Sequence, residues 1–243
     1  MKKILCMAAG LLMIVSLAAC TSKKDELVMA TNAEFQPYEY HQGDKIVGID
    51  VEICQAIADD LGKDLVIEDM AFDSVITSVY TGKADLGVAG LTITEDRLKN
   101  VNFSDPYTIA TQVIIVKDDS DIASPDDLVG KTIGVQLGTT GDLYAEDIED
   151  AVLERYNKGF EAVQALSQGK IDAVIIDNEP AKVYVSQNDG LKIVDEAFTY
   201  EEYAIAIAKD NTQLLNEVNA SIAKLKESGK LDEIINKYIS SDN

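Results

Sequence analysis

Strand-like and helix-like segments alternate along almost the whole chain, and this alternation most constrains its fold. Short apolar runs rich in β-branched residues are followed by amphipathic segments, and turns containing Gly or Asp join them. The pattern predicts layered α/β architecture with mainly parallel strand pairing. Strands are expected at residues 27–31, 64–69, 86–89, 112–117, 132–136, 173–176, 191–194 and 203–208. Helices are expected at residues 51–61 (with Asp50 as N-cap), 74–81, 140–149, 160–168, 179–187, 213–227 and 231–238.

One unit of sequence occurs twice. Residues 81–89 (TGKADLGVA) and 168–176 (QGKIDAVII) each join the end of a helix, through Gly-Lys and Asp, to an apolar strand. We expect one copy in each of two lobes; the alternative is a chance similarity between common turns. Ligands of open α/β sheets bind beyond the carboxyl ends of the strands. The segment 90–92 and Asp177, which follow the two strands, are therefore candidates for a binding site.

The first residues predict export. Lys2 and Lys3 precede an apolar stretch at residues 4–19, which is shorter than the roughly 20 residues of a membrane-spanning helix. Residues 1–19 are therefore interpreted as a signal peptide. The run Leu17-Ala18-Ala19-Cys20 resembles the lipobox of bacterial lipoproteins, which implies lipidation of Cys20 and a tether at residues 20–26. The chain would then be anchored to the outer face of the cell membrane, or to its periplasmic side; the alternative is an ordinary signal peptide with Cys20 incidental.

Charge and residue types exclude several classes of function. The formal net charge of −22 makes nucleic acids and anionic surfaces poor partners. Cys54 lies on a helical apolar face, where a buried hydrophobic role is expected. His41 is the single histidine, which excludes the usual His-containing triads and multi-histidine metal sites. We therefore expect neither an enzyme nor a bound metal or cofactor.

Two charged residues are candidates for ligand binding. Arg97 stands at the start of a short helical turn that Thr94 is expected to cap. An arginine among backbone N–H groups binds a carboxylate with two parallel hydrogen bonds; the alternative is an exposed arginine near Glu95 and Asp96. Asp177 follows four apolar residues, and its carboxylate would either pair with an ammonium group or cap the next helix.

Two further segments are candidates for pocket walls. The loop at residues 138–141 (GTTG) offers backbone donors and hydroxyls to an anion, but it lacks the Gly-Lys-Ser/Thr of a Walker loop. Phe35, Tyr38 and Tyr40 cluster after the first strand, and Phe72 follows the second. These rings either enclose a ligand or cover the edge of a core.

The chain resembles the polar amino acid substrate-binding proteins of ABC importers, which have the type II periplasmic-binding-protein fold. The resemblance runs from about Leu27 to the C-terminus. The segments that carry it are residues 30–40 (ATNAEFQPYEY), 48–52 (GIDVE), 89–97 (AGLTITEDR) and 102–107 (NFSDPY).

This resemblance implies two Rossmann-like lobes with a central ligand cleft, joined by two crossover strands near residues 111–116 and 200–207. Lobe 1 would comprise residues 27–110 and 203–243, and lobe 2 would comprise residues 111–202. Closure would desolvate a bound zwitterion and strengthen its charge pairs. Because neither lobe holds both charge partners, closure and binding would be coupled.

The resemblance also implies roles for individual residues. Arg97 would bind the α-carboxylate, and Asp177 would bind the α-ammonium group. The groups that would assist them are Gly90, Leu91, Thr92, Thr139 and Thr140. Around the ligand side chain, Phe35 and Phe72 would form the walls. The residues that would set specificity are Asn32, Glu34 and Gln136; many members of the family carry an acid at the position of Asn32, so their ligands do not transfer directly.

The function that follows is that of a substrate-binding lipoprotein. As a monomer, it would capture a polar or basic L-amino acid for the membrane permease of an ABC importer. Glu34 suits the cationic side chain of arginine or lysine, whereas Asn32 and Gln136 suit glutamine or another neutral polar side chain. Two alternatives are a dehydratase-like enzyme acting on carboxylic acids, and an amino acid sensor domain that signals through another protein.

Overall fold

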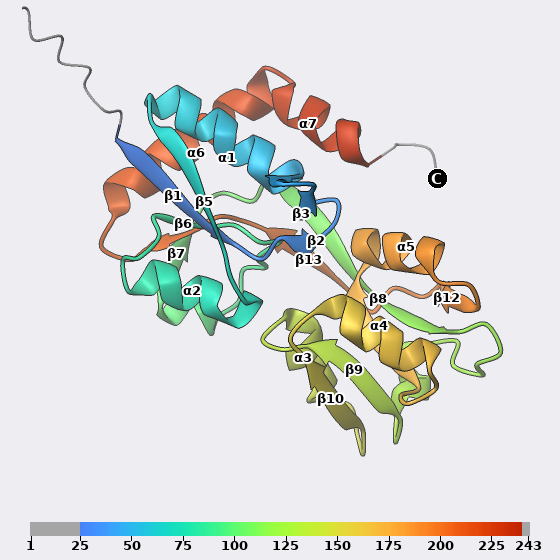
Figure 1. Cartoon of the computed structure of the whole chain (residues 1–243). Coiled ribbons are helices and arrows are strands. Elements are labelled where there is room, and N and C mark those ends of the chain that lie inside the picture. Colours follow the sequence, from blue (N-terminus) through green and yellow to red (C-terminus); the bar gives the residue numbers. More distant parts are fainter. Residues whose placement is uncertain (1–24, 240–243) are drawn as a thin grey trace, which may run out of the picture.

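The computed structural model describes residues 25–239, which form two α/β lobes (Figure 1). The predicted signal peptide, the lipidation site at Cys20 and most of the predicted tether lie outside the described residues. Within residues 25–239, every helix is too short or too polar to cross a membrane. The predicted α/β architecture with two lobes is confirmed.

The first lobe is built on a five-stranded sheet of order β5-β1-β6-β14-β7. Its strands are β1 (Glu26–Thr31), β5 (Asp64–Asp69), β6 (Leu86–Gly87), β7 (Val101–Phe103) and β14 (Ala206–Ala208). Its helices are α1 (Ile49–Leu61), α2 (Phe72–Tyr80), α6 (Thr212–Glu227) and α7 (Lys230–Tyr238). Successive side chains of a strand point to opposite faces, so Met29 packs among residues of α1, α6 and α7, whereas Ala30 packs against α2.

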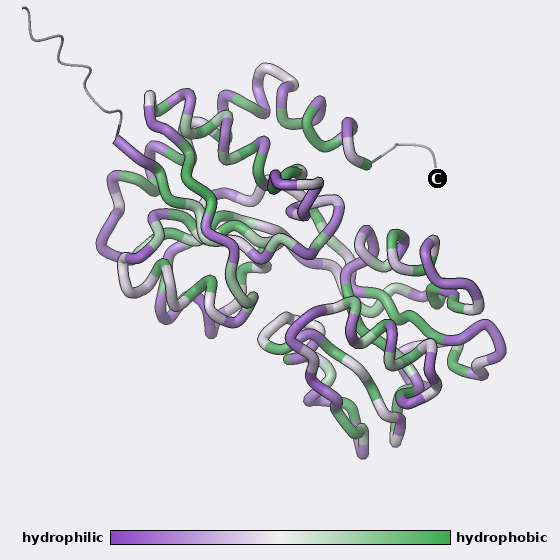
Figure 2. The backbone as a smooth tube through the Cα atoms, viewed as in Figure 1, coloured by the Kyte–Doolittle hydropathy of each residue, from purple (hydrophilic) through white to green (hydrophobic). Residues whose placement is uncertain are grey.

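The second lobe is built on a sheet of order β10-β9-β11-β8-β12, with β13 also paired to β8. Its strands are β8 (Thr108–Lys117), β9 (Thr132–Gln136), β10 (Val152–Tyr156), β11 (Ala173–Asp177), β12 (Leu191–Ile193) and β13 (Thr199–Tyr203). Its helices are α3 (Thr140–Ala145), α4 (Gly159–Ser167) and α5 (Asn178–Gln187). Val174 packs in the cluster that contains α4 residues, and Ile175 packs in the one that contains Ala145 of α3. Figure 2 shows hydrophobic and hydrophilic segments alternating along the helices of both lobes.

The expectation of mainly parallel pairing is wrong. β1 is parallel to β5 and β6, and β9 is parallel to β10 and β11, but the remaining pairings are antiparallel. The antiparallel pairs come largely from β8, β13 and β14, on which the chain passes between the lobes without a crossover helix (Figure 1). β8 and β13 pair over Thr108–Gln112, as expected for two crossover strands.

The repeated sequence unit has the same structure in both lobes. Gly82 and Gly169 both adopt left-handed conformations, with φ of +71° and +67°. Asp85 Oδ2 then accepts the backbone N–H of Val28 at 2.8 Å, and Asp172 Oδ2 accepts that of Thr132 at 2.8 Å. In each lobe the unit therefore joins a helix to one strand and caps the neighbouring parallel strand.

Several element predictions are corrected. A three-stranded sheet of β2 (Glu34–Phe35), β3 (Glu39–Gln42) and β4 (Lys45–Val47) replaces the loop expected around the aromatic cluster. The short strand β7 and the exposed edge strand β10 were not expected, because neither has an extended apolar run. Helix α3 ends at Ala145, before the predicted end at 149. The expected strand 203–208 is divided between β13 and β14.

The predicted N-cap of α1 is also wrong. The helix begins at Ile49 after Gly48, whose φ of +137° favours glycine and whose added Cβ would lie 2.0 Å from the Tyr38 carbonyl oxygen. Asp50 is consequently inside the first turn and fully buried, where its carboxylate has a different role. Cys54 is fully buried on the same helix, as predicted.

Candidate ligand-binding cleft

Arg97 lies between the two lobes without a carboxylate partner. Its Nη1 donates to the Thr92 carbonyl oxygen at 2.8 Å, and its Nη2 reaches the second lobe at the Gly138 carbonyl oxygen, at 3.1 Å. Phe72 lies beneath the guanidinium, 5.5 Å from ring centroid to Cζ. The Thr94 hydroxyl accepts the Arg97 N–H at 3.1 Å, as expected for a cap. Within residues 25–239 no carboxylate forms an ion pair with Arg97, and the hydrogen bonds of its guanidinium go to neutral carbonyls.

Asp177 is a buried carboxylate without a cationic partner among the described residues. It precedes α5 but makes no side-chain cap hydrogen bond; instead it accepts the hydroxyl of Tyr203. Its side chain is at the carboxyl end of β11 and only 6% of the residue is exposed. Burial, and then the negative charge of Glu201, raise the pKa of Asp177 to about 7.

Glu201 on β13 is a second buried carboxylate in the same region, 5% exposed. Its Oε2 accepts the Thr92 hydroxyl at 2.8 Å and the Gln112 side-chain amide at 3.1 Å. Burial lowers the pKa of Arg97, while the negative charges of Glu201 and Asp177 act in the opposite direction. Two buried carboxyl groups and one guanidinium therefore share this end of the cleft, and a cationic group bound beside Asp177 would stabilise its charged form.

Two more carboxyl groups lie behind Gly90. Asp50 Oδ2 accepts the Gly90 N–H at 2.9 Å, and its Oδ1 accepts the Tyr107 hydroxyl at 2.8 Å. Burial, and then the neighbouring Asp50 charge, raise the pKa of Glu39 well above its ordinary value and favour the neutral acid. Asp50 therefore fixes the loop at Gly90 from the core side, away from the cleft.

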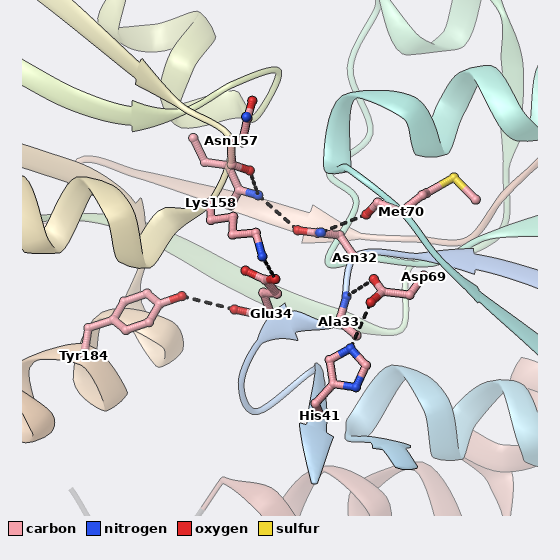
Figure 3. A network of polar contacts seen from close by, with 10 residues as sticks. Asn32, Ala33, Glu34, His41, Asp69, Met70, Asn157, Lys158 and Tyr184 are labelled. Atoms are coloured by element: carbon pink, nitrogen blue, oxygen red, sulfur yellow. Dashed lines mark hydrogen bonds and ion pairs between the residues drawn. The ribbon is translucent and has the colours of Figure 1, made fainter. Parts of the chain in front are cut away.

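A second group of polar residues joins the two lobes (Figure 3). The Gln136 amide donates to Asn32 Oδ1 at 3.0 Å and to the Asn157 carbonyl oxygen at 3.2 Å. Glu34 forms an ion pair with Lys158 through Oε1. The three residues predicted to set specificity are therefore all in contacts between the lobes: Asn32 with Gln136, and Glu34 with Lys158.

The remaining predicted residues are placed around these two ends. Leu91 is fully buried in the core, so only its backbone is available. Phe35 stacks on Tyr38 with ring centroids 5.9 Å apart. Two hydroxyls are already bonded: Thr139 caps α3, and Thr140 accepts the Gln112 amide at 3.4 Å. In the described part of the chain no cluster of His, Cys, Asp and Glu has the geometry of a metal site.

Comparison with known proteins gives the family. Residues 27–241 match the model of bacterial extracellular solute-binding proteins, family 3. The chain belongs to this family. The arginine-binding extracellular protein ArtP of Bacillus subtilis is 34% identical, with both chains covered in full. An ancestral arginine-binding protein bound to arginine is 40% identical with a TM-score of 0.85, covering 90% of this chain and all of its own. An ancestral arginine-binding protein bound to glutamine is 39% identical with a TM-score of 0.83, covering 90% and 99%.

Sequence reasoning missed two charged residues of this solute-binding protein, Glu201 and Lys158. Glu201 stands two residues before the buried Tyr203, and residues 199–203 alternate between buried and more exposed positions. The sequence of this strand, TYEEY, has no matching alternation of apolar residues, so nothing in it separates the buried Glu201 from the exposed Glu202. Lys158 precedes α4 as one of many polar turn residues, and nothing in the sequence pairs it with Glu34.

Replacing Gly90 by alanine should destabilise the solute-binding protein through the cleft loop. Its φ is +54°, and an added Cβ would lie 3.0 Å from Phe35 Cε1 and 3.1 Å from Tyr203 Cε2. We expect a loss of about 1–3 kcal/mol in the free energy of unfolding, measured by chemical denaturation. Gly82→Ala is the control, because Gly82 has φ of +71° but no atom within 4 Å of the added Cβ. Equal losses in both variants would contradict the steric part of this argument.

Proposed function

We propose that this chain captures a polar or basic L-amino acid and delivers it to the permease of an ABC importer. The observation that carries the proposal is the pair of unmatched charges: Arg97 has no anion and Asp177 has no cation among the described residues. The α-carboxylate and α-ammonium groups of a zwitterion supply both. A buried charge is strongly destabilising without a partner, so the gain on binding is large.

Each group around this pair has a role in the proposal. Arg97 turns from the carbonyl oxygens of Thr92 and Gly138 to the α-carboxylate, for which its planar fork suits two parallel hydrogen bonds. Asp177 takes the ammonium group, with the Gly90 carbonyl and the Thr92 hydroxyl beside it. The backbone and hydroxyls of Thr139 and Thr140 assist Arg97 from the second lobe.

The side-chain end of the cleft supports a polar or basic ligand. Asn32 and Gln136 offer amide groups, Glu34 offers a carboxylate, and Phe35 and Phe72 offer apolar walls. Relatives of this chain include proteins named for arginine, and a solved structure of one such protein contains glutamine. Long side chains with a terminal donor group therefore fit both the residues present and the relatives.

The proposed lobe boundaries are residues 27–110 and 203–243 for lobe 1, and residues 111–202 for lobe 2. Arg97 belongs to the first lobe and Asp177 to the second, so a zwitterion bridges them and favours the closed arrangement. The hinge lies where β8 and β13 pair. This coupling gives the permease a means to distinguish loaded from empty protein.

Export follows from membership of an extracellular solute-binding family. We further propose cleavage after residue 19, acylation of Cys20, and a tether at residues 20–26 that holds a monomer at the outer surface of the membrane. Mass spectrometry of the exported protein tests this proposal: a diacylglyceryl group on an N-terminal Cys20 is expected. An unmodified Cys20, or cleavage elsewhere, would contradict it.

A thermal-shift screen of the twenty amino acids tests the proposed function. A ligand that binds the native state raises the melting temperature in proportion to the logarithm of its concentration over Kd. We expect shifts with polar or basic L-amino acids and none with their D-enantiomers, because Arg97 and Asp177 fix the arrangement at the α-carbon. Turnover of a carboxylic acid without saturable amino acid binding would overturn the proposal.

A further inference from the structure

Three contacts bring the lobes together at the side-chain end of the cleft (Figure 3). Lys158 forms an ion pair with Glu34, Gln136 donates to Asn32 at 3.0 Å, and the Tyr184 hydroxyl donates to the Glu34 carbonyl oxygen at 3.1 Å. Two of the three contacts involve Glu34. Glu34 is therefore held from both its side chain and its backbone by the second lobe.

The Glu34 carboxylate is only half used by these contacts. Lys158 occupies Oε1, whereas Oε2 is buried and has no hydrogen-bond partner among the described residues. A buried oxygen of a carboxylate without a donor is costly. Glu34 also lines a cavity of about 500 Å³ between the β2–β3 hairpin and helices α4 and α5, whose wall includes Phe160 and Tyr184 but neither Asn32 nor Gln136.

Lys158 is the more exposed partner of the ion pair. Its side chain is 41% exposed, against 24% for that of Glu34. It also lies over the Phe160 ring, 5.7 Å from Nζ to the centroid, which gives its ammonium group a second favourable place. The charges near it are all negative: Glu34 first, then Glu161 and Asp69, and together they raise the pKa of Lys158.

We propose that Lys158 is a specificity-determining residue that weakens the preference of the cleft for cationic over neutral amino acid side chains. The inference rests on the proposed function. Lys158 neutralises Glu34, the acidic residue at this end of the cleft. A cationic ligand side chain therefore meets a carboxylate whose charge Lys158 already neutralises, and it is also repelled by the positive charge of Lys158. A neutral polar side chain with a donor group meets no such repulsion, because it bonds to the unpartnered Glu34 Oε2 while the ion pair stays in place.

Arginine and citrulline are the probes for this proposal. Citrulline has nearly the shape of arginine but an uncharged urea group in place of the guanidinium, so the ratio of their Kd values isolates the effect of charge. We expect Lys158→Gln to increase the preference for arginine over citrulline by about tenfold, measured by calorimetry. Glu34→Gln leaves the charge of Lys158 uncompensated and should therefore lower the preference for arginine below the wild-type value. Lys158→Arg, which keeps the positive charge, should leave it near the wild-type value.

Lys224→Gln is the matched control. Lys224 pairs with Asp60 at 2.7 Å between α6 and α1, away from the cleft, and its loss changes the net charge by the same amount. A shift of the arginine-to-citrulline ratio in this variant as large as that in Lys158→Gln would overturn the inference, since it would then be an effect of net charge alone.

The experiment separates the two proposals. An unchanged ratio in Lys158→Gln, with amino acid binding intact, overturns the role of Lys158 and leaves the proposed function standing. If arginine binds neither the wild type nor Lys158→Gln, the role of Lys158 is also overturned, even where another amino acid binds. Absence of binding of any amino acid to any variant overturns the proposed function itself.

Discussion

Replacing Arg97 by alanine should abolish amino acid binding and leave the empty protein folded. The guanidinium donates to the carbonyl oxygens of Thr92 and Gly138 at this end of the cleft. Without it, the α-carboxylate of a ligand would be buried unpaired. We expect binding to weaken by about 3–5 kcal/mol, which places Kd beyond the range of a thermal-shift or calorimetric titration.

Lys99→Ala is the control for this variant. Lys99 belongs to the same short helical turn, η1 (Arg97–Lys99), but its side chain is 71% exposed and pairs with Asp96. Lys99→Ala therefore removes a positive charge two residues from Arg97 but outside the cleft, and amino acid binding should be unchanged. The melting temperature of the empty Arg97→Ala protein should stay close to that of the wild type, because the loss of two hydrogen bonds is offset by relief of a desolvated charge. An unchanged amino acid affinity in Arg97→Ala would contradict the proposal that Arg97 binds the α-carboxylate of the ligand.

The sequence predicted the lobes well because local signals and burial agree there. Residues 173–177 are apolar up to a final Asp and form a strand that is buried throughout, so both the strand and the exceptional residue at its end were visible. The repeated Gly-Lys-x-Asp unit was predictable for the same reason: a left-handed glycine and a capping carboxylate are properties of a few adjacent residues.

Contacts between distant residues were not predictable. Asp50 lies in an acidic, helix-start pattern that suits an N-cap, yet tertiary packing buries it and directs its carboxylate to Gly90 and Tyr107. The pairing of Glu34 with Lys158 joins residues more than a hundred positions apart, across two lobes. The sequence identified residues with suitable chemistry for the cleft, but only the fold determines which of them face each other.

Replacing Asp177 by asparagine should weaken amino acid binding roughly 100-fold and remove most of its dependence on pH. The carboxylate is needed in its charged form to pair with the α-ammonium group, and its pKa in the empty protein is raised to about 7 by burial and then by Glu201. In the wild type, lowering the pH from about 8 to about 5 protonates Asp177 in the empty state. Below pH 7 the affinity should therefore decrease with falling pH, with a slope that approaches about tenfold per pH unit.

The stability of the empty protein should change in the opposite direction. An aspartate whose pKa is higher in the folded than in the unfolded state, where it is about 3.9, binds a proton more readily when folded. Its ionisation therefore destabilises the fold above pH 7, and stability increases as the pH falls from 7 toward 4. Glu39, whose pKa is also raised by burial, contributes in the same direction. Wild-type protein should thus show a rising melting temperature and a shrinking ligand-induced shift over the same acid range.

Asp177→Asn distinguishes this mechanism from a general effect of acid. The asparagine carbonyl still accepts the Tyr203 hydroxyl, so the fold is retained, and above pH 7 the empty variant should be more stable than the wild type because a buried charge is gone. The stability of the empty variant should still depend partly on pH, because the pKa of Glu39 is also raised by burial. The residual affinity, measured by calorimetry across the same pH range, should be nearly constant. If the affinity still falls below pH 7 as steeply as in the wild type, the titrating group is not Asp177, and the proposed pairing of Asp177 with the α-ammonium group is wrong.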